Sequence, residues 1–319
     1  MNSLHRDHHI HQETSAATLP EPATHQNQRK KYTFGGYLRS YWHDYLTLAL
    51  MGALGLAIYT LRPAPNRNFP LLFADGEIVY PEFSYPLRKN IIPIWLAAFL
   101  AFIFGFLATT IMQIRIRSFH DWNSGFLGLL YSLVTAAVFQ VFLKWLIGGL
   151  RPHFYSVCQP SLTPPPGTGY RSIMVDRSVC TGDEKLINDA LESFPSGHST
   201  AAFAGLVFTS LYLNAKLKIF SNYHPSYPKF VLFFAPILGA TLIAGSLTID
   251  EFHHWWDVLA GGIIGTVMAF AAFRFVYAGV FDWRVNHIPL VRNPEWEGVE
   301  RDAVFSRKGR VGETEDLKL

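Results

Sequence analysis

Two basic residues, Lys144 and Arg151, stand seven positions apart at the end of an apolar stretch, with Pro152 directly after them. On a helix this spacing places both cations on one face, two turns apart, and Pro152 ends the helix. Placing a charged side chain at membrane depth costs free energy, so two cations without a neighbouring acid predict a binding site for an anion. The alternative is that both side chains extend separately to the membrane interface.

A second group of residues, Phe194 to Ser199, reads F-P-S-G-H-S and comes immediately before another apolar stretch. Small residues at a helix N-terminus expose free backbone N–H groups and the positive end of the helix dipole, which together bind anions. Ser196 adds a hydroxyl donor, and His198 adds a proton donor that works near neutral pH. The alternative is that Ser196 only caps the helix.

A third group, residues 246–258, contains His253 and Asp257 four positions apart, so they share a face if a helix begins early enough. A carboxylate on the far imidazole nitrogen stabilises the imidazolium and makes the near nitrogen a competent nucleophile. Zinc is the competing interpretation, because His254 adjoins His253. Adjacent helical residues diverge by ~100° and no third ligand is evident, so the pattern favours a nucleophilic histidine and no metal.

Apolar segments must position these groups. Half of the 319 residues are hydrophobic and only 16% are charged, whereas about 25% are charged in an ordinary soluble domain. The apolar residues gather into uncharged runs near the ~20 residues that cross a bilayer. The sequence therefore predicts an all-α, polytopic membrane bundle of about six transmembrane helices, near residues 45–61, 91–112, 124–146, 199–215, 230–246 and 256–280.

Polar segments flank this region. We expect a disordered cytosolic tail at 1–43, a transmembrane domain at 44–281 and a second polar cytosolic tail at 282–319. The histidines near the start of the chain lie in a polar tract that gives a metal no fixed geometry. The net charge of +3 is small and carries no nucleic-acid signature. The bilayer is therefore the expected partner, and no nucleic acid is expected.

The topology follows from the number of spans. Six spans place both termini on one side, and the basic loops 113–122 and 216–229 predict that this side is the cytosol. The three groups then meet at the opposite, non-cytosolic face. Cys158 and Cys180 lie in one loop on that face, where an oxidising compartment allows a disulfide, with two free thiols as the alternative.

Taken together, the three groups resemble the signatures of the type 2 phosphatidic acid phosphatase superfamily, which are K-x6-R-P, P-S-G-H and S-R-x5-H-x3-D. The matches fall at 144–152, 195–198 and 246–257, and the resemblance covers roughly residues 45–280. The H-H doublet followed by D-V looks most like the lipid phosphate phosphatase and diacylglycerol pyrophosphate phosphatase branch. This resemblance implies a membrane phosphatase that acts on phosphatidate, lysophosphatidate or diacylglycerol pyrophosphate.

The resemblance also implies a role for each matching residue. His253 is expected to be the nucleophile that takes the phosphoryl group, Asp257 its orienting partner, and His198 the acid that protonates the leaving alkoxide. Water then hydrolyses the phosphohistidine, and neither a metal nor another cofactor is expected. The residues expected to bind the phosphate are Lys144, Arg151, Ser196, Gly197 and Ser246.

One position departs from the signatures, because Leu247 replaces the arginine of the third motif. Loss of one such donor can lower a rate on the order of 10²–10³-fold. A catalytically weakened homologue that binds phospholipid headgroups or regulates a partner is therefore the alternative, and an anion transporter is a more distant one. Retention of His198, His253 and Asp257 together favours the enzyme, because a binding protein needs neither a nucleophile nor an acid.

Overall fold

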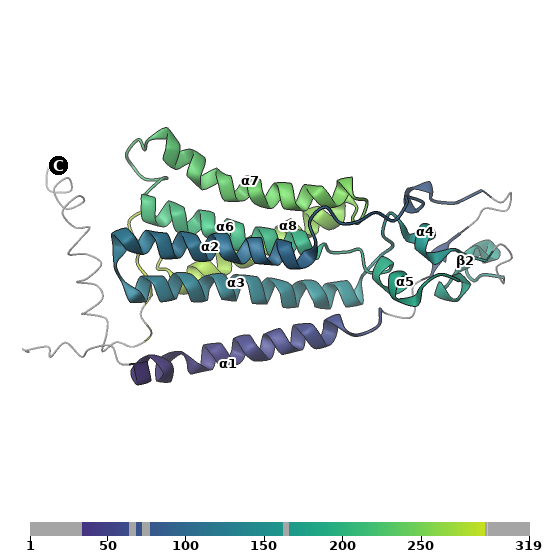
Figure 1. Ribbon diagram of the computed structural model, residues 1–319, viewed down its shortest axis with the longest axis horizontal. Helices are drawn as coiled ribbons and strands as arrows, with labels where there is room; N and C mark the ends of the chain where they lie inside the picture. Colours follow the sequence, from purple (N-terminus) through teal and green to yellow (C-terminus); the bar gives the residue numbers. More distant parts are fainter. Residues whose placement is uncertain (1–33, 64–67, 72–76, 162–165, 291, 293–319) are drawn as a thin grey trace, which may run out of the picture.

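Six long helices run side by side along the long axis of the molecule (Figure 1). The computed structural model describes residues 34–63, 68–71, 77–161, 166–290 and 292. Each predicted apolar segment falls on one of the long helices, which are α1 (Phe34–Tyr59), α2 (Ile94–Ile116), α3 (Phe119–Leu146), α6 (Gly197–Leu217), α7 (Tyr227–Ile249) and α8 (Trp255–Val276).

Four of these helices, α2, α3, α7 and α8, are long and apolar enough to cross a membrane. The predicted all-α membrane bundle is therefore confirmed. The count of six spans stays a prediction, because α1 and α6 are not among these four helices; both carry polar side chains, such as Asp44 in α1 and Asn214 in α6.

Helix α6 lies at the centre of the bundle and packs against α2, α3, α7 and α8. Protein therefore shields most of its polar side chains from lipid, and Thr209 and Ser210 are buried. Small residues permit this close packing. A Cβ atom on Gly205 would lie 2.3 Å from the carbonyl oxygen of Ala101 in α2, and one on Gly261 of α8 would lie 2.5 Å from the carbonyl oxygen of Ser196. The second contact holds the start of α8 against the start of α6.

Helix α1 begins at Phe34, about ten residues before the predicted boundary of the polar tail. Aromatic side chains explain the earlier start, because Tyr41 is buried and the hydroxyl of Tyr37 donates to Oδ1 of Asn123 in α3 at 2.7 Å. Most of both predicted tails, residues 1–33 and 293–319, lies outside the described residues. The division into a central domain and two tails stays a prediction.

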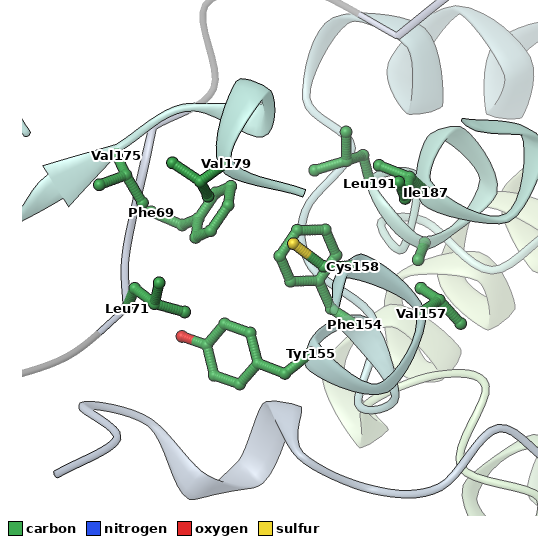
Figure 2. Close-up of a cluster of buried hydrophobic side chains, with 11 residues drawn as sticks. Phe69, Leu71, Phe154, Tyr155, Val157, Cys158, Val175, Val179, Ile187 and Leu191 are labelled. Atoms are coloured by element: carbon green, nitrogen blue, oxygen red, sulfur yellow. The ribbon is translucent and has the colours of Figure 1, made fainter. Parts of the chain in front are cut away.

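A small extramembrane unit covers one end of the bundle (Figure 1). It contains two short helices, α4 (Phe154–Cys158) and α5 (Glu184–Ala190), and an antiparallel pair of strands, β1 (Phe69–Pro70) and β2 (Met174–Val175), in which Phe69 faces Val175. Figure 2 shows the separate apolar core of this unit, formed by Phe69, Leu71, Phe154, Tyr155, Val157, Cys158, Val175, Val179, Ile187, Ala190 and Leu191.

Candidate active site

The first two groups of predicted site residues are joined through the backbone. After α3 ends, the chain pairs with the segment that leads into α6, so that Ser193 N–H donates to the Gly149 carbonyl at 3.1 Å and Arg151 N–H donates to the Ala190 carbonyl at 2.9 Å. Arg151 therefore lies beside the P-S-G-H segment, although more than forty residues separate the two in sequence.

The third group is bonded to both of the others. The N–H of Ser196 donates to the backbone carbonyl of Asp257 at 3.0 Å, and Nε2 of His254 lies 3.1 Å from the carbonyl oxygen of Leu150. The structure thus brings all three predicted groups together at the end of the bundle that the extramembrane unit covers (Figure 1).

His253 and Asp257 form the expected pair. Helix α8 begins two residues after His253, yet the imidazole still faces the carboxylate, with Nδ1 of His253 3.6 Å from Oδ2 of Asp257. The same oxygen accepts hydrogen bonds from Oγ of Ser193 at 2.5 Å and from the N–H of His254 at 3.1 Å. These donors keep Asp257 ionised and fix its orientation.

The charge state of His253 suits a nucleophile. The side chain is almost fully buried, and burial lowers the pKa of His253 to about 3, with Arg151 and Lys144 adding to the decrease and Asp257 opposing it. The imidazole is therefore neutral near pH 7. With Nδ1 facing the carboxylate, the lone pair of Nε2 is available for attack.

His198, the second residue of α6, is also buried. One ring nitrogen bonds to the backbone carbonyl of Ile92, just before α2, whereas Nε2 is buried without a hydrogen-bond partner among the described residues. The Ile92 carbonyl fixes the ring and leaves Nε2 free for a ligand, and Nε2 can donate a proton to a leaving group when the ring is an imidazolium.

Lys144 and Arg151 are both buried, at 9% and 6% exposure. Buried cations require compensation by anions or hydrogen bonds. Among the described residues, three polar atoms of the predicted site are buried without a hydrogen-bond partner: Arg151 Nε, His198 Nε2 and Asp257 Oδ1. These atoms are therefore available to a polar ligand.

The other predicted phosphate-binding residues have defined positions. Ser196 is the N-cap of α6 and its Oγ accepts from Ser199 N–H at 3.4 Å, while Gly197 is the first helical residue. The cap therefore exists, and the hydroxyl proton of Ser196 stays available as a donor. Ser246 differs, because its hydroxyl donates to the Ile243 carbonyl of its own helix at 2.8 Å. Phosphate binding by these residues stays a prediction.

Leu247 is completely buried, and its carbonyl accepts hydrogen bonds from the N–H groups of Phe252 and His253 at 3.1 and 3.2 Å. The backbone of Leu247 thus fixes the loop that carries His253, although the Leu247 side chain offers no donor to an anion. Arg177 of the extramembrane unit, a basic residue that could have supplied the missing cation, pairs with Glu184 at 3.6 Å.

The two cysteines are joined. A disulfide links Cys158, at the end of α4, to Cys180, which lies 22 positions later in the sequence.

The side chain of His254, the second histidine of the doublet, stacks on Trp256 with ring centroids 4.3 Å apart. The described residues contain no group of three or more His, Cys, Asp or Glu side chains placed to hold a metal ion.

Three contributors to the site were missed by the sequence interpretation. Ser193 orients Asp257, Ile92 orients His198, and Asp189 of α5 binds Arg151. Ser193 and Asp189 lie three and seven residues before Ser196, so proximity to the motif was the one available signal. Ile92 acts through its carbonyl group, which no side-chain pattern reveals.

The fold and the site define a mainly helical integral membrane protein with a buried histidine–aspartate pair beside two buried cations. Residues 125–280, which contain all three motifs, match the PAP2 superfamily, and the chain belongs to that family. A PA-phosphatase related-family protein of Dictyostelium discoideum is 34% identical over 257 residues, which cover 78% of this chain and 73% of the relative.

Two further relatives carry more specific names. Lipid phosphate phosphatase 2 of Arabidopsis thaliana is 32% identical over 74% of this chain and 78% of the relative. The probable diacylglycerol pyrophosphate phosphatase 1 of Schizosaccharomyces pombe is 29% identical over 76% of this chain and 85% of the relative. No solved structure matches the chain.

Proposed function

We propose that this protein is an integral membrane lipid phosphate phosphatase that removes phosphate from phosphatidate, lysophosphatidate or diacylglycerol pyrophosphate. One observation carries the proposal: the buried imidazole of His253 faces Asp257 at 3.6 Å, beside two buried cations. A protein that only bound headgroups would need the cations but not this pair. The names of the relatives support the substrate class.

The proposed reaction has two steps. Nε2 of His253 attacks phosphorus while the bond to the leaving oxygen breaks, and His198, as the imidazolium, donates a proton to that oxygen. The lipid alcohol leaves, or phosphatidate when the substrate is diacylglycerol pyrophosphate. Water then attacks phosphorus, His198 accepts a proton from it, the P–N bond breaks and inorganic phosphate leaves. Lys144, Arg151 and the first N–H groups of α6 stabilise the charge that develops on the phosphoryl oxygens.

No metal is required by this mechanism, because fixed cations and helix N-terminal amides take its electrostatic role. Activity is therefore expected to survive EDTA. Orthovanadate should inhibit, because it adopts the five-coordinate geometry of phosphorus in the transition state. A strict requirement for added Mg²⁺ would contradict the proposed mechanism.

The proposed orientation places the site on the luminal or extracellular side and both termini in the cytosol. Basic residues at the opposite end of the bundle, such as Arg115, Arg117 and Lys229, support it. Lys216 contributes less than the sequence suggested, because it pairs with Asp121 inside the bundle. Labelling of Asn222→Cys from the cytosol, with Lys185→Cys protected, is expected. The reverse pattern would overturn the orientation.

The function is tested on purified protein in detergent, with phosphate release measured from the three lipids in EDTA. We expect release by the wild type, none by His253→Ala and very little by His198→Ala, because each variant loses a chemical role. Gel filtration and thermal unfolding confirm that the variants are folded. Equal release by wild type and His253→Ala, or none by a folded wild type, would reject the proposal.

A further inference from the structure

Arg151, a cation of the candidate site, is already bound by a carboxylate from outside the three motifs. Its Nη1 lies 2.8 Å from Oδ2 of Asp189, and its Nη2 lies 2.8 Å from Oδ1. This two-point contact is the geometry that arginine also uses to bind phosphate. Asp189 therefore occupies the donors that a phosphate would otherwise take.

The remaining contacts fix the guanidinium. Its carbon lies 5.4 Å from the ring centroid of Phe252, the residue before the proposed nucleophile, and Nε is buried without a partner among the described residues. Arg151 is thus held in one orientation by Asp189 and Phe252. The Nε–H group stays available to a ligand.

Asp189 lies on α5, at the exposed edge of the site. Its side chain is 48% exposed, whereas that of Arg151 is 7% exposed. A half-exposed carboxylate can turn toward water when an anion takes its place, whereas the buried arginine cannot leave. The pair can therefore exchange one anion for another at little cost to the carboxylate.

Asp189 also acts on the other site residues through its charge, because Lys144 and His198 both lie within its electrostatic range. A negative charge near an anion site weakens anion binding. The weakening of anion binding by Asp189 is larger in this protein than in a site with a third cation, because Leu247 stands where the family motif has an arginine.

We propose that Asp189 sets the phosphate affinity of the site by competing with the phosphate group for Arg151. This inference deepens the proposed function and rests on it. Asp189 orients Arg151 before phosphate binds, and its charge keeps the binding of the product phosphate weak enough for release. It is a positioning and affinity-determining residue, and it takes no proton and forms no bond to phosphorus.

The experiment measures binding of inorganic phosphate and orthovanadate to purified protein in detergent, by isothermal titration at constant pH and ionic strength. Asp189→Asn keeps the shape of the side chain and removes its charge. We expect the Kd of both anions to fall about 10-fold. Inhibition by product phosphate should strengthen by the same factor, because both measurements report the same site.

Glu184→Gln is the matched control. It removes one negative charge from the same helix, but Glu184 pairs with Arg62 and Arg177 at 3.3 and 3.6 Å, not with Arg151. The Kd of Glu184→Gln for phosphate and orthovanadate should stay close to that of the wild type. A second control places Asp189→Asn in an Arg151→Gln background. The gain in affinity should there fall to the small part that comes from the charge of Asp189 at a distance, because its main effect acts through Arg151.

An unchanged or higher Kd in folded Asp189→Asn would overturn the inference, as would an equal gain in the Arg151→Gln background. If Asp189→Asn does not fold, Asp189→Ser is titrated with the same expectation, and Asp189→Glu, which keeps the charge, should retain the wild-type Kd. The outcome is separable from the proposed function. Absence of lipid hydrolysis by the wild type would reject the function, whereas normal hydrolysis with an unchanged Kd would reject this inference alone.

Discussion

The hydroxyl oxygen of Ser193 lies 2.5 Å from Oδ2 of Asp257, the same oxygen that faces the imidazole of His253. Ser193 is buried, so water does not reach this carboxylate oxygen to take the place of the serine donor. The serine thereby holds the carboxylate in the position from which it faces His253, the proposed nucleophile.

Ser193→Ala should lower kcat about 10- to 100-fold with little change in KM, because a hydrogen bond to a charged group contributes roughly 1.5–3 kcal/mol and phosphate is bound by other residues. Steady-state kinetics on phosphatidate measure both constants. Ser178→Ala, in the extramembrane unit, is the control. An unchanged kcat in folded Ser193→Ala would show that Asp257 does not need this donor.

Leu247→Arg tests whether a missing cation limits the rate. The backbone carbonyl of Leu247 accepts hydrogen bonds from the loop that carries His253, so an arginine side chain at position 247 begins close to the proposed phosphate site. We expect kcat/KM to rise by up to about 10²–10³, mainly through kcat. Because Leu247 is fully buried, the added charge should also lower the thermal stability of the anion-free protein, and orthovanadate should restore it.

Leu247→Met controls for the change in shape, and His253→Ala,Leu247→Arg controls for contaminating phosphatase. A fully active wild type whose turnover falls in Leu247→Arg would show that no cation is missing. If both proteins fold, bind orthovanadate and hydrolyse nothing, the weakened homologue is the correct interpretation.

The pH dependence of stability follows from His253. Its pKa is about 3 in the folded protein and about 6.5 in an unfolded chain. Between these values the unfolded chain binds the additional proton, so the contribution to stability is present above pH 6.5 and is lost as pH falls toward 3. The thermal midpoint in detergent should fall between pH 7.5 and 5.0, and His253→Gln should reduce that fall. Equal slopes for both proteins would contradict the buried, neutral imidazole.

The disulfide should stabilise the extramembrane unit. It closes a loop of about the length for which chain entropy gives roughly 3 kcal/mol, and Cys158 lies in the apolar core of Figure 2. Cys158→Ser,Cys180→Ser should therefore increase tryptic cleavage between residues 154 and 190. Reduction of the wild type should have the same effect, and resistance of both would contradict a stabilising bridge.

Much of the fold was predictable because it depends on local composition. Runs of apolar residues predicted all six long helices, and the alternation of chain direction predicted that the three motifs meet at one end. The start of α1 lies earlier than predicted, because Tyr37 stabilises it through a hydrogen bond to Asn123 of α3, which the sequence of α1 does not reveal.

The site was predictable only in part, for a similar reason. His198, His253 and Asp257 could be recognised from spacing and residue type. Ser193 and Asp189 gain their roles from partners 64 and 38 residues away, through the pairing of the chain after α3 with the chain before α6. Such contacts depend on the tertiary fold, and no local pattern encodes them.

The most direct test of the account is to trap the phosphorylated protein. Wild type is mixed with ³²P-labelled phosphatidate, quenched within milliseconds in alkali and digested, and the labelled peptide is identified by mass spectrometry. We predict an acid-labile, alkali-stable phosphohistidine at His253 that is absent from His253→Ala. Label at another residue, or single-turnover hydrolysis without any protein-bound phosphate, would contradict the mechanism.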